Sequence, residues 1–244
     1  MSSFGKIAPH YDLLMSNVPY DMWAGYFQLL LTRFNQEPET LLDVCCGTGS
    51  VAEILTRADY QVTGFDLSSP MIAEAKRKAV AKNLKIDYHV ADARTVDLGL
   101  TFEGAYSFFD SLNYIAELEG LHQALIRIGD HLPEGAPFIF DVNTAYAFEA
   151  RMFDQRENRS RAKLKYNWVG DYDPATRIIQ VKMDFEWESE RFTETHIQRA
   201  HSDEEVRAGL RDAGFSWVTA FDSYTLDAPR AKSDRIHYVA MKGA

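Results

Sequence analysis

The chain has 244 residues, of which 46% are hydrophobic and 25% are charged, and these values are ordinary for a folded protein. They exclude wholesale disorder and allow one well-covered α/β core with a modest insertion. The formal net charge of −10 would repel a phosphate backbone, so we expect no nucleic-acid partner.

The first half of the chain alternates apolar strands with amphipathic helical stretches. Strands are predicted at residues 40–46, 61–67, 85–91, 103–109 and 137–142. Helices are predicted at residues 50–58, 69–82 and 118–132. Such alternation is typical of parallel βαβ units with right-handed crossovers and helices on both faces of one sheet.

After Asn143 the pattern becomes that of antiparallel strands. Apolar and polar residues alternate from Ile179 to Trp187, which indicates a strand with one buried and one wet face. A turn at residues 171–174 and strands at residues 163–169 and 192–200 would pair with it. We therefore expect a small antiparallel sheet in this part of the chain.

Helical periodicity returns at residues 202–213, where Ser202 and Glu205 form a capping pattern and Gly214 ends the helix. The chain closes with predicted strands at residues 216–224 and 235–242. We divide the chain into a main domain of residues 1–150 and 201–244, with an N-terminal helical lid, and a β insertion of residues 151–200.

The N-terminal residues, the short apolar stretches and the cysteines together predict a cytoplasmic location. Residues 1–6 lack the pattern of a signal peptide, and the most apolar stretch, residues 26–34, is far too short to span a bilayer. Cys45 and Cys46 are adjacent, cannot form a structural disulfide of the usual kind, and suit a reducing compartment. The seven histidines show no metal-ligand spacing, so we expect no metal.

The sharpest local feature is the glycine loop Asp-Val-Cys-Cys-Gly-Thr-Gly at residues 43–49, between the first strand and its helix. Gly47 and Gly49 allow a tight turn and a close approach to a ligand. Asp66 follows at the end of the second strand, where a carboxylate can accept hydrogen bonds from both hydroxyls of a ribose. These features suit a nicotinamide cofactor or S-adenosylmethionine, and a glycine turn without a cofactor is the plain alternative.

Three further features favour the methyl donor. Asp43 lies four residues before Gly47, where it can hold an ammonium group and would repel a pyrophosphate. Asp92 ends the third strand between small neighbours, where it can accept from an adenine amino group. No second catalytic domain follows. An NAD(P)-dependent oxidoreductase and a non-catalytic S-adenosylmethionine-binding protein remain the alternatives.

The glycine loop also resembles motif I of class I S-adenosylmethionine-dependent methyltransferases. Residues 65–68 with Met71 resemble their motif II, and residues 91–93 resemble their motif III. The whole chain is similar to small bacterial methyltransferases of the methyltransferase-25/type-11 kind. The resemblance implies methyl transfer on a Rossmann-like, doubly wound α/β fold, with a mostly parallel seven-stranded sheet and a small antiparallel β insertion before the last helix.

The loop chemistry and the resemblance together predict the donor site. Its residues are Tyr11, Tyr20, Asp43, Gly47, Gly49, Asp66, Leu67, Met71, Asp92 and Ala93. The two tyrosines belong to it because N-terminal aromatic residues of such domains can close over the cofactor. Cys45 departs from the family pattern, since glycine or alanine usually stands there. A thiol is small enough, so we expect tighter packing and retained binding.

The acceptor is expected at the carboxyl ends of strands four and five. Asp110 is the first choice for a base or orienting group, and Tyr114 is the second. Asn113 and Asn143 are expected to bind the acceptor, although Asp110 and Asn113 have turn capping as an equal alternative. The predicted partner is a small-molecule acceptor, and the protein is expected to be a monomer or a homodimer.

Overall fold

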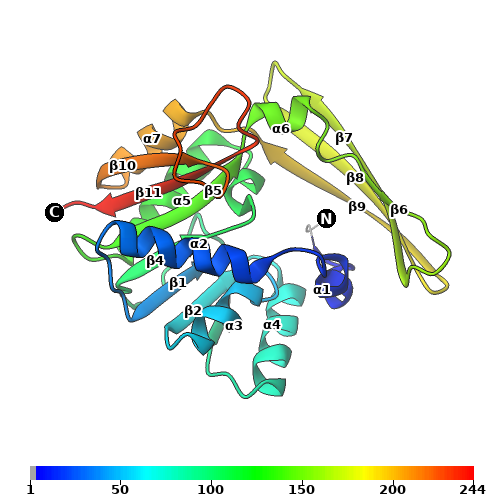
Figure 1. Ribbon diagram of the computed structural model, residues 1–244, viewed down its shortest axis with the longest axis horizontal. Helices are drawn as coiled ribbons and strands as arrows, with labels where there is room; N and C mark the ends of the chain where they lie inside the picture. The colour runs from blue at the N-terminus through cyan, green and yellow to red at the C-terminus, as the bar shows by residue number, and fades with distance from the viewer. Residues whose placement is uncertain (1–3) are drawn as a thin grey trace.

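A seven-stranded sheet forms the centre of the computed structural model, which describes residues 4–244 (Figure 1). Its strand order is β10-β11-β5-β4-β1-β2-β3. The strands are β1 (Thr40–Val44), β2 (Gln61–Asp66), β3 (Asp87–Val90), β4 (Gly104–Ser107), β5 (Pro137–Asn143), β10 (Phe215–Asp222) and β11 (Arg235–Lys242). Strands β1 to β5 pair in parallel, whereas β11 runs antiparallel to both β5 and β10. The predicted α/β fold class, with its mostly parallel sheet, is confirmed.

Helices cover both faces of this sheet, because the parallel strands are apolar on both sides. One face packs against α2 (Tyr20–Arg33), α3 (Ser50–Arg57) and α4 (Ser69–Ala81). The other packs against α5 (Leu118–Asp130) and α7 (Asp203–Asp212). All seven residues of β5 are buried between the two layers. No helix within residues 4–244 combines the length and the apolar character that crossing a bilayer requires.

The short elements lie near the carboxyl ends of the parallel strands. They are η1 (Ala8–His10), α1 (Tyr11–Leu14), η2 (Ser111–Tyr114) and α6 (Ala145–Glu149). The capping box of Ser202 and Glu205, at the start of α7, is present as predicted. The five-residue helix α6, by contrast, is too short for its periodicity to be recognised.

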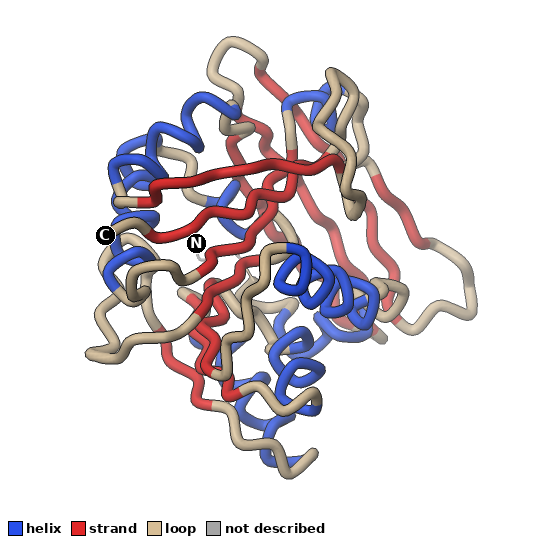
Figure 2. The backbone as a smooth tube through the Cα atoms, turned by 60° about the vertical axis from the view of Figure 1, so that its left-hand side comes forward, coloured by secondary structure: helices blue, strands red, loops and turns tan. Residues whose placement is uncertain are grey.

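A second sheet carries the antiparallel pattern. It contains β6 (Gln155–Glu157), β7 (Leu164–Asp173), β8 (Ile178–Trp187) and β9 (Glu190–Arg199), in that order. It projects from the main sheet and curves beside the N-terminal helices, as Figure 2 shows. The apolar residues of β8 face inward and pack with Ile7 and Phe148. The predicted insertion before the last helix is therefore present.

The turn of the β7–β8 hairpin lies later than predicted. Strand β7 continues through Asp173, so residues 171–173 are extended rather than turned. The carboxylate of Asp173 accepts from the Ala175 amide at 2.9 Å and from the Thr176 hydroxyl at 2.8 Å, and Arg177 takes a φ of 61°. This side-chain capping anchors the turn at residues 174–177, directly after Asp173.

The glycine loop leaves β1 with a left-handed backbone at three alternate positions, Cys45, Gly47 and Gly49. Gly47 and Gly49 have φ values of 55° and 76°, and a β-carbon on Gly49 would lie 2.1 Å from the Tyr88 hydroxyl. Cys45 has a φ of 59°, in the region that favours glycine. The cysteine therefore occupies a backbone position for which a glycine is better suited.

We expect Cys45→Gly to be more stable than Cys45→Ala by roughly 0.5–1 kcal/mol, because only alanine keeps a β-carbon in the left-handed conformation. Both variants lose the same sulfur, so the difference isolates the backbone. Urea denaturation measures it. Cys46 is the matched control, since its φ is not positive. There alanine should be the more stable variant, and the same order at both positions would contradict this explanation.

Candidate active site

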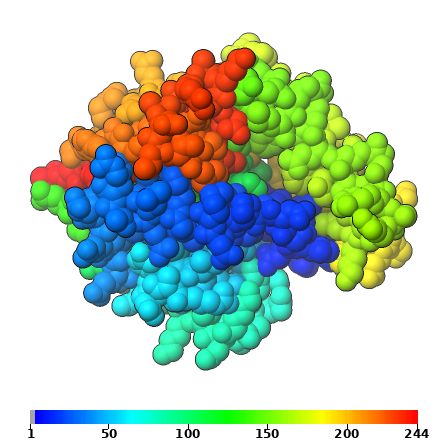
Figure 3. All heavy atoms as spheres, viewed as in Figure 1, coloured from blue at the N-terminus to red at the C-terminus, as the bar shows by residue number. Residues whose placement is uncertain are grey.

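A cavity of about 540 Å³ lies beyond the carboxyl ends of the parallel strands. Its volume is in the usual range for a small-molecule site. The glycine loop and the ends of β2, β3 and β4 form one side, and strands β7 to β9 of the insertion form the other. In Figure 3 the N-terminal segment crosses the front of the molecule between the main domain and the insertion.

Asp66 closes the glycine loop at the end of β2. Its carboxylate accepts from the Gly47 amide at 2.9 Å and from the Ser68 amide at 2.8 Å. Burial raises the pKa of Asp66, and the two amide hydrogen bonds oppose this shift. A carboxylate offers about four acceptor sites, so two remain for a ligand in the cavity that Asp66 lines.

Asp43 is an unpaired acid on the same side of the cavity. Its side chain is buried, and its Oδ2 atom has no hydrogen-bond partner among the described residues. Burial raises the pKa of Asp43 to about 8, the adjacent Tyr106 hydroxyl opposes this shift, and the nearby Asp66 carboxylate adds to it. A buried acceptor without a partner is costly. The site is therefore prepared for a cationic group from a ligand.

The predicted adenine side of the site is more open. Asp92, Ala93, Leu67 and Met71 line the cavity, and Leu67 is largely exposed. The Asp92 carboxylate already pairs with the Arg94 guanidinium at 2.6 Å. An adenine amino group would share Asp92 with this arginine, so the Asp92 role stays a prediction.

The N-terminal segment is fastened to the glycine loop. The Thr48 hydroxyl donates to Asp12 at 2.6 Å, and the Lys78 ammonium pairs with the other oxygen of Asp12 at 2.5 Å. This attachment holds Tyr11 and Tyr20 against the cavity, which both side chains line. Their predicted contact with the methyl donor stays a prediction.

The other attachment of the segment is Glu194 on β9. Its carboxylate accepts from the backbone amides of Phe4 at 3.1 Å, Lys6 at 2.7 Å and Ile7 at 3.1 Å. We call residues 4–14, held at Asp12 and at Glu194, the strap. The strap connects the insertion to the glycine loop across the cavity.

The same carboxylate organises a histidine. Nε2 of the buried His196 lies 3.0 Å from Glu194, and its Nδ1 lies 2.9 Å from the Tyr114 hydroxyl. Burial alone would raise the pKa of Glu194, but hydrogen bonds from His196 and the strap amides outweigh it and lower this pKa. An ionised Glu194 favours the proton on Nε2, which leaves Nδ1 free to accept from Tyr114.

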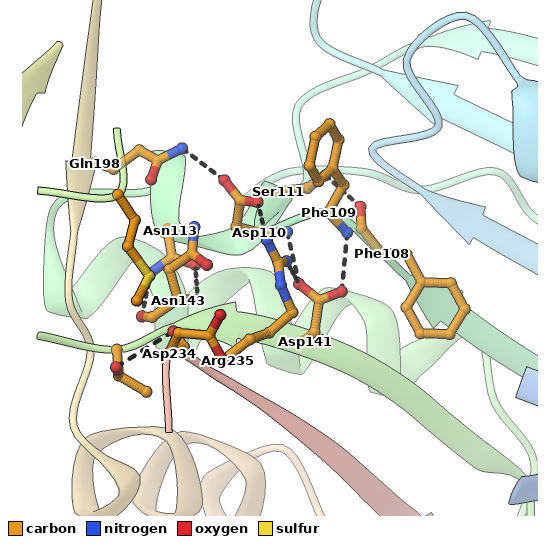
Figure 4. A network of polar contacts seen from close by, with 12 residues as sticks. Phe108, Phe109, Asp110, Ser111, Asn113, Asp141, Asn143, Gln198, Asp234 and Arg235 are labelled. Atoms are coloured by element: carbon orange, nitrogen blue, oxygen red, sulfur yellow. Dashed lines mark hydrogen bonds and ion pairs between the residues drawn. The ribbon is translucent and has the colours of Figure 1, made fainter. Parts of the chain in front are cut away.

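A second polar network fixes the strand ends (Figure 4). The buried Asp141 carboxylate accepts from the Phe109 amide at 2.9 Å and from the Asp110 amide at 2.6 Å. Arg235 from β11 pairs with Asp141 and, at 2.8 Å, with Asp110. Phe109 and Asp110 have φ values of 70° and 51°, so this network sustains a strained turn after β4.

Asp110 itself is more constrained than a free base would be. One oxygen accepts from Arg235, and the other accepts from the Gln198 side chain at 2.8 Å. Burial raises the pKa of Asp110, while the guanidinium opposes this shift. The Arg235 guanidinium and the Gln198 amide fix the direction of the carboxylate, so Asp110 suits an orienting role.

The four remaining predicted positions divide into two groups. Tyr114 and Asn143 line the cavity, but Asn113 and Gly49 do not. The Asn113 amide donates to the carbonyls of Asn143 and Arg199 and accepts from the Asn143 amide, so its side chain ties backbone segments together. Gly49 provides the turn into α3. The expectation that Asn113 contacts ligand is corrected accordingly, whereas the predicted donor contact of Gly49 stays a prediction.

Sequence reasoning missed His196, Gln198 and Arg235. All three line the cavity, and each bonds to a residue 82 or more positions away in the chain. A weak signal existed, because His196 and Gln198 are polar residues on the alternating face of β9 that is otherwise turned inward. Buried polar side chains on such a face are informative.

The two thiols offer no nucleophile. Burial raises the pKa of Cys45 and of Cys46, and the neighbouring carboxylates add to the shift. Both side chains therefore stay protonated and behave as small apolar groups. Within the described range 4–244, no group of three or more histidine, cysteine or acidic side chains is arranged to hold a metal ion.

Comparisons with known proteins agree on one chemistry. A family model described as a methyltransferase domain matches residues 41–135. A candidate methyltransferase of Geobacillus sp. (strain WCH70) is 29% identical, over 98% of this chain and 100% of its own length. A dTDP-3-amino-3,6-dideoxy-alpha-D-glucopyranose N,N-dimethyltransferase of Streptomyces fradiae is 34% identical, over 54% of this chain and 51% of its own length.

Solved structures show the same arrangement. An S-adenosylmethionine-dependent methyltransferase from Clostridium acetobutylicum is 25% identical, and the alignment covers 98% of both chains with a TM-score of 0.86. An amino pentose methyltransferase from Micromonospora echinaspora with S-adenosylmethionine bound has a TM-score of 0.75, covers 99% of both chains and is 18% identical. The latter likeness concerns the fold alone.

Asp43→Asn should stabilise the ligand-free protein more at about pH 8 than at about pH 5. The folded state retains the Asp43 proton up to a pKa of about 8, whereas the unfolded chain releases it near 3.8. Stability is therefore lost as the pH rises between these values, and asparagine has no such loss. Thermal unfolding at both pH values measures the effect.

The exposed Asp59 provides the control, because its side chain lies in solvent. Asp59→Asn should change stability equally at both pH values. An Asp43→Asn effect that is also independent of pH would show that Asp43 is ionised in the free protein.

Proposed function

Because the chain is a class I S-adenosylmethionine-dependent methyltransferase, we propose that it methylates an oxygen or nitrogen atom of a small-molecule acceptor. The acceptor would lie between the strand ends of the main sheet and the insertion. One observation carries this proposal: the two sides of a single cavity bear different chemistry. Acidic side chains and Gly47 line one side, and a hydrogen-bonded tyrosine and histidine line the other.

The acidic side matches the donor. The unpaired Asp43 oxygen would hold the ammonium group of its amino acid end, and the two unused acceptor sites of Asp66 would hold the ribose hydroxyls. Ala93 and Asp92 would flank the adenine. When bound there, S-adenosylmethionine supplies a methyl group that its sulfonium already activates. The protein's main contribution is then alignment, which can be worth roughly 7–11 kcal/mol.

The opposite side handles the acceptor's proton. Glu194 holds His196 with its proton on Nε2, and Nδ1 accepts from the Tyr114 hydroxyl. Tyr114 would receive the proton of the attacking atom as its own proton passes to His196. This assigns the base to Tyr114 and His196, while Asp110 orients the acceptor through Gln198.

The relatives support a small acceptor. The Streptomyces fradiae protein is named for an amino sugar, which is a small molecule methylated on nitrogen. The net charge of −10 supports the exclusion of nucleic acid as the acceptor. We also propose that the protein works in the cytoplasm, as a monomer or a homodimer.

Asp66→Ala tests the donor site. The variant should bind S-adenosylhomocysteine about tenfold or more weakly by calorimetry, because charge-assisted hydrogen bonds contribute roughly 1.5–3 kcal/mol each. Asp87→Ala, in the exposed first position of β3, should bind like the wild type. Equal thermal midpoints would show that both variants fold. Unchanged affinity in Asp66→Ala would remove this residue from the donor site.

His196→Gln tests the proton relay. Turnover of a hydroxyl or amine acceptor at saturation should fall about 10²-fold or more, with donor affinity retained. His89→Gln, outside the cavity, is the control. Nitrogen NMR of labelled histidine adds a direct test, because protonation of His196 on Nδ1 in the neutral form would contradict the relay.

A further inference from the structure

The acceptor side of the cavity is walled by apolar and aromatic side chains. The wall consists of Met15 from the N-terminal segment and Met152, Phe153, Trp168, Met183 and Phe185 from the insertion. We call this part of the cavity the insertion chamber. Thioethers and aromatic rings pack favourably against another flat ring. The same wall offers few partners to a molecule that carries many hydroxyl groups.

Two buried polar atoms of the insertion chamber have no partner among the described residues. They are the Trp168 indole nitrogen and the Gln198 amide oxygen. Trp168 is 8% exposed and Gln198 is 1% exposed, and both line the cavity. An unsatisfied buried group costs about 1–3 kcal/mol. One donor and one acceptor therefore await a ligand that brings only a few polar atoms.

The third component is the base. An aromatic hydroxyl has a pKa of about 10, like that of a tyrosine, so it keeps its proton near neutral pH. Tyr114 and His196, which border the chamber, form the arrangement that removes such a proton. A charged amine, by contrast, would lose its hydration against the apolar wall.

We infer that the insertion chamber binds an aromatic hydroxyl compound and that the protein methylates its oxygen. This inference rests on the proposed function and adds the chemical class of the acceptor. The ring lies against the apolar wall, and its polar substituent reaches the unpaired atoms of Trp168 and Gln198. The hydroxyl faces Tyr114.

The reaction balances without another reagent. The acceptor oxygen forms a bond to the methyl carbon as the carbon–sulfur bond breaks, and that electron pair stays on sulfur in S-adenosylhomocysteine. The hydroxyl proton passes to the Tyr114 oxygen, and the Tyr114 proton passes to Nδ1 of His196. The imidazolium is stabilised by Glu194 until it releases the proton to water.

The test uses naphthalene-2,6-diol as a planar aromatic hydroxyl probe and glucosamine as an amino sugar probe. One hydroxyl of the diol can face Tyr114 while the other reaches the unpaired atoms of Trp168 and Gln198. Calorimetry measures the binding of each to the full chain saturated with S-adenosylhomocysteine. With S-adenosylmethionine instead, mass spectrometry detects the gain of one methyl group. Trp168→Phe keeps a ring but removes the unpaired N–H, and the exposed Trp217→Phe is the matched control.

We expect naphthalene-2,6-diol to bind and to gain a methyl group, and glucosamine to do neither. Trp168→Phe should weaken binding of the diol about fivefold, the effect of losing one buried hydrogen bond, and Trp217→Phe should not. Binding of glucosamine in place of the diol, binding of neither, or equal binding by both tryptophan variants would overturn the inference. Failure of S-adenosylhomocysteine itself to bind would instead overturn the proposed function.

Discussion

The buried carboxylate of Asp141 is the constraint on which the acceptor side of the site depends. It lies at the end of β5 and binds two backbone amides that follow β4 and the guanidinium of Arg235 from β11. The carboxyl ends of β4 and β5 and the first residue of β11 are thereby held in one fixed arrangement. Without this anion the left-handed turn at Phe109 and Asp110 would lose both its hydrogen bonds and its counter-charge. Removing one partner of such a buried ion pair is strongly destabilising, because it leaves an uncompensated charge.

Most of the fold follows from local patterns in the sequence. The alternation of strands and helices, the cap at Ser202 and the period of two from Ile179 to Trp187 each depend on neighbouring residues only. Elements of three to five residues, such as β6 and α6, carry too little periodicity to be recognised. The left-handed backbone at Cys45 was also unpredictable, because a cysteine gives no local signal for that conformation.

The candidate site likewise has one side that local sequence patterns predict and one side that they do not. The donor side was predictable, since the glycine loop and Asp66 lie 19 positions apart and belong to consecutive strands. The acceptor side was not, because His196 and Gln198 reach it only through the path of the insertion over the main sheet. Asn113 shows the converse error. A polar residue after a strand suits a ligand contact, yet its amide is consumed by backbone groups.

Glu194 gives one carboxylate two tasks, because it fastens the strap and also fixes the proton on His196. The two tasks are thermodynamically linked. Opening the strap would remove three amide donors from the carboxylate and expose it to water. The carboxylate would become more basic, and it would attract the Nε2 proton of His196 more strongly. Opening the strap would therefore change the basicity of the Tyr114–His196 pair through its Glu194 partner. We therefore expect proton transfer to be effective only while the strap lies over the cavity and holds bulk water away from the reacting atoms.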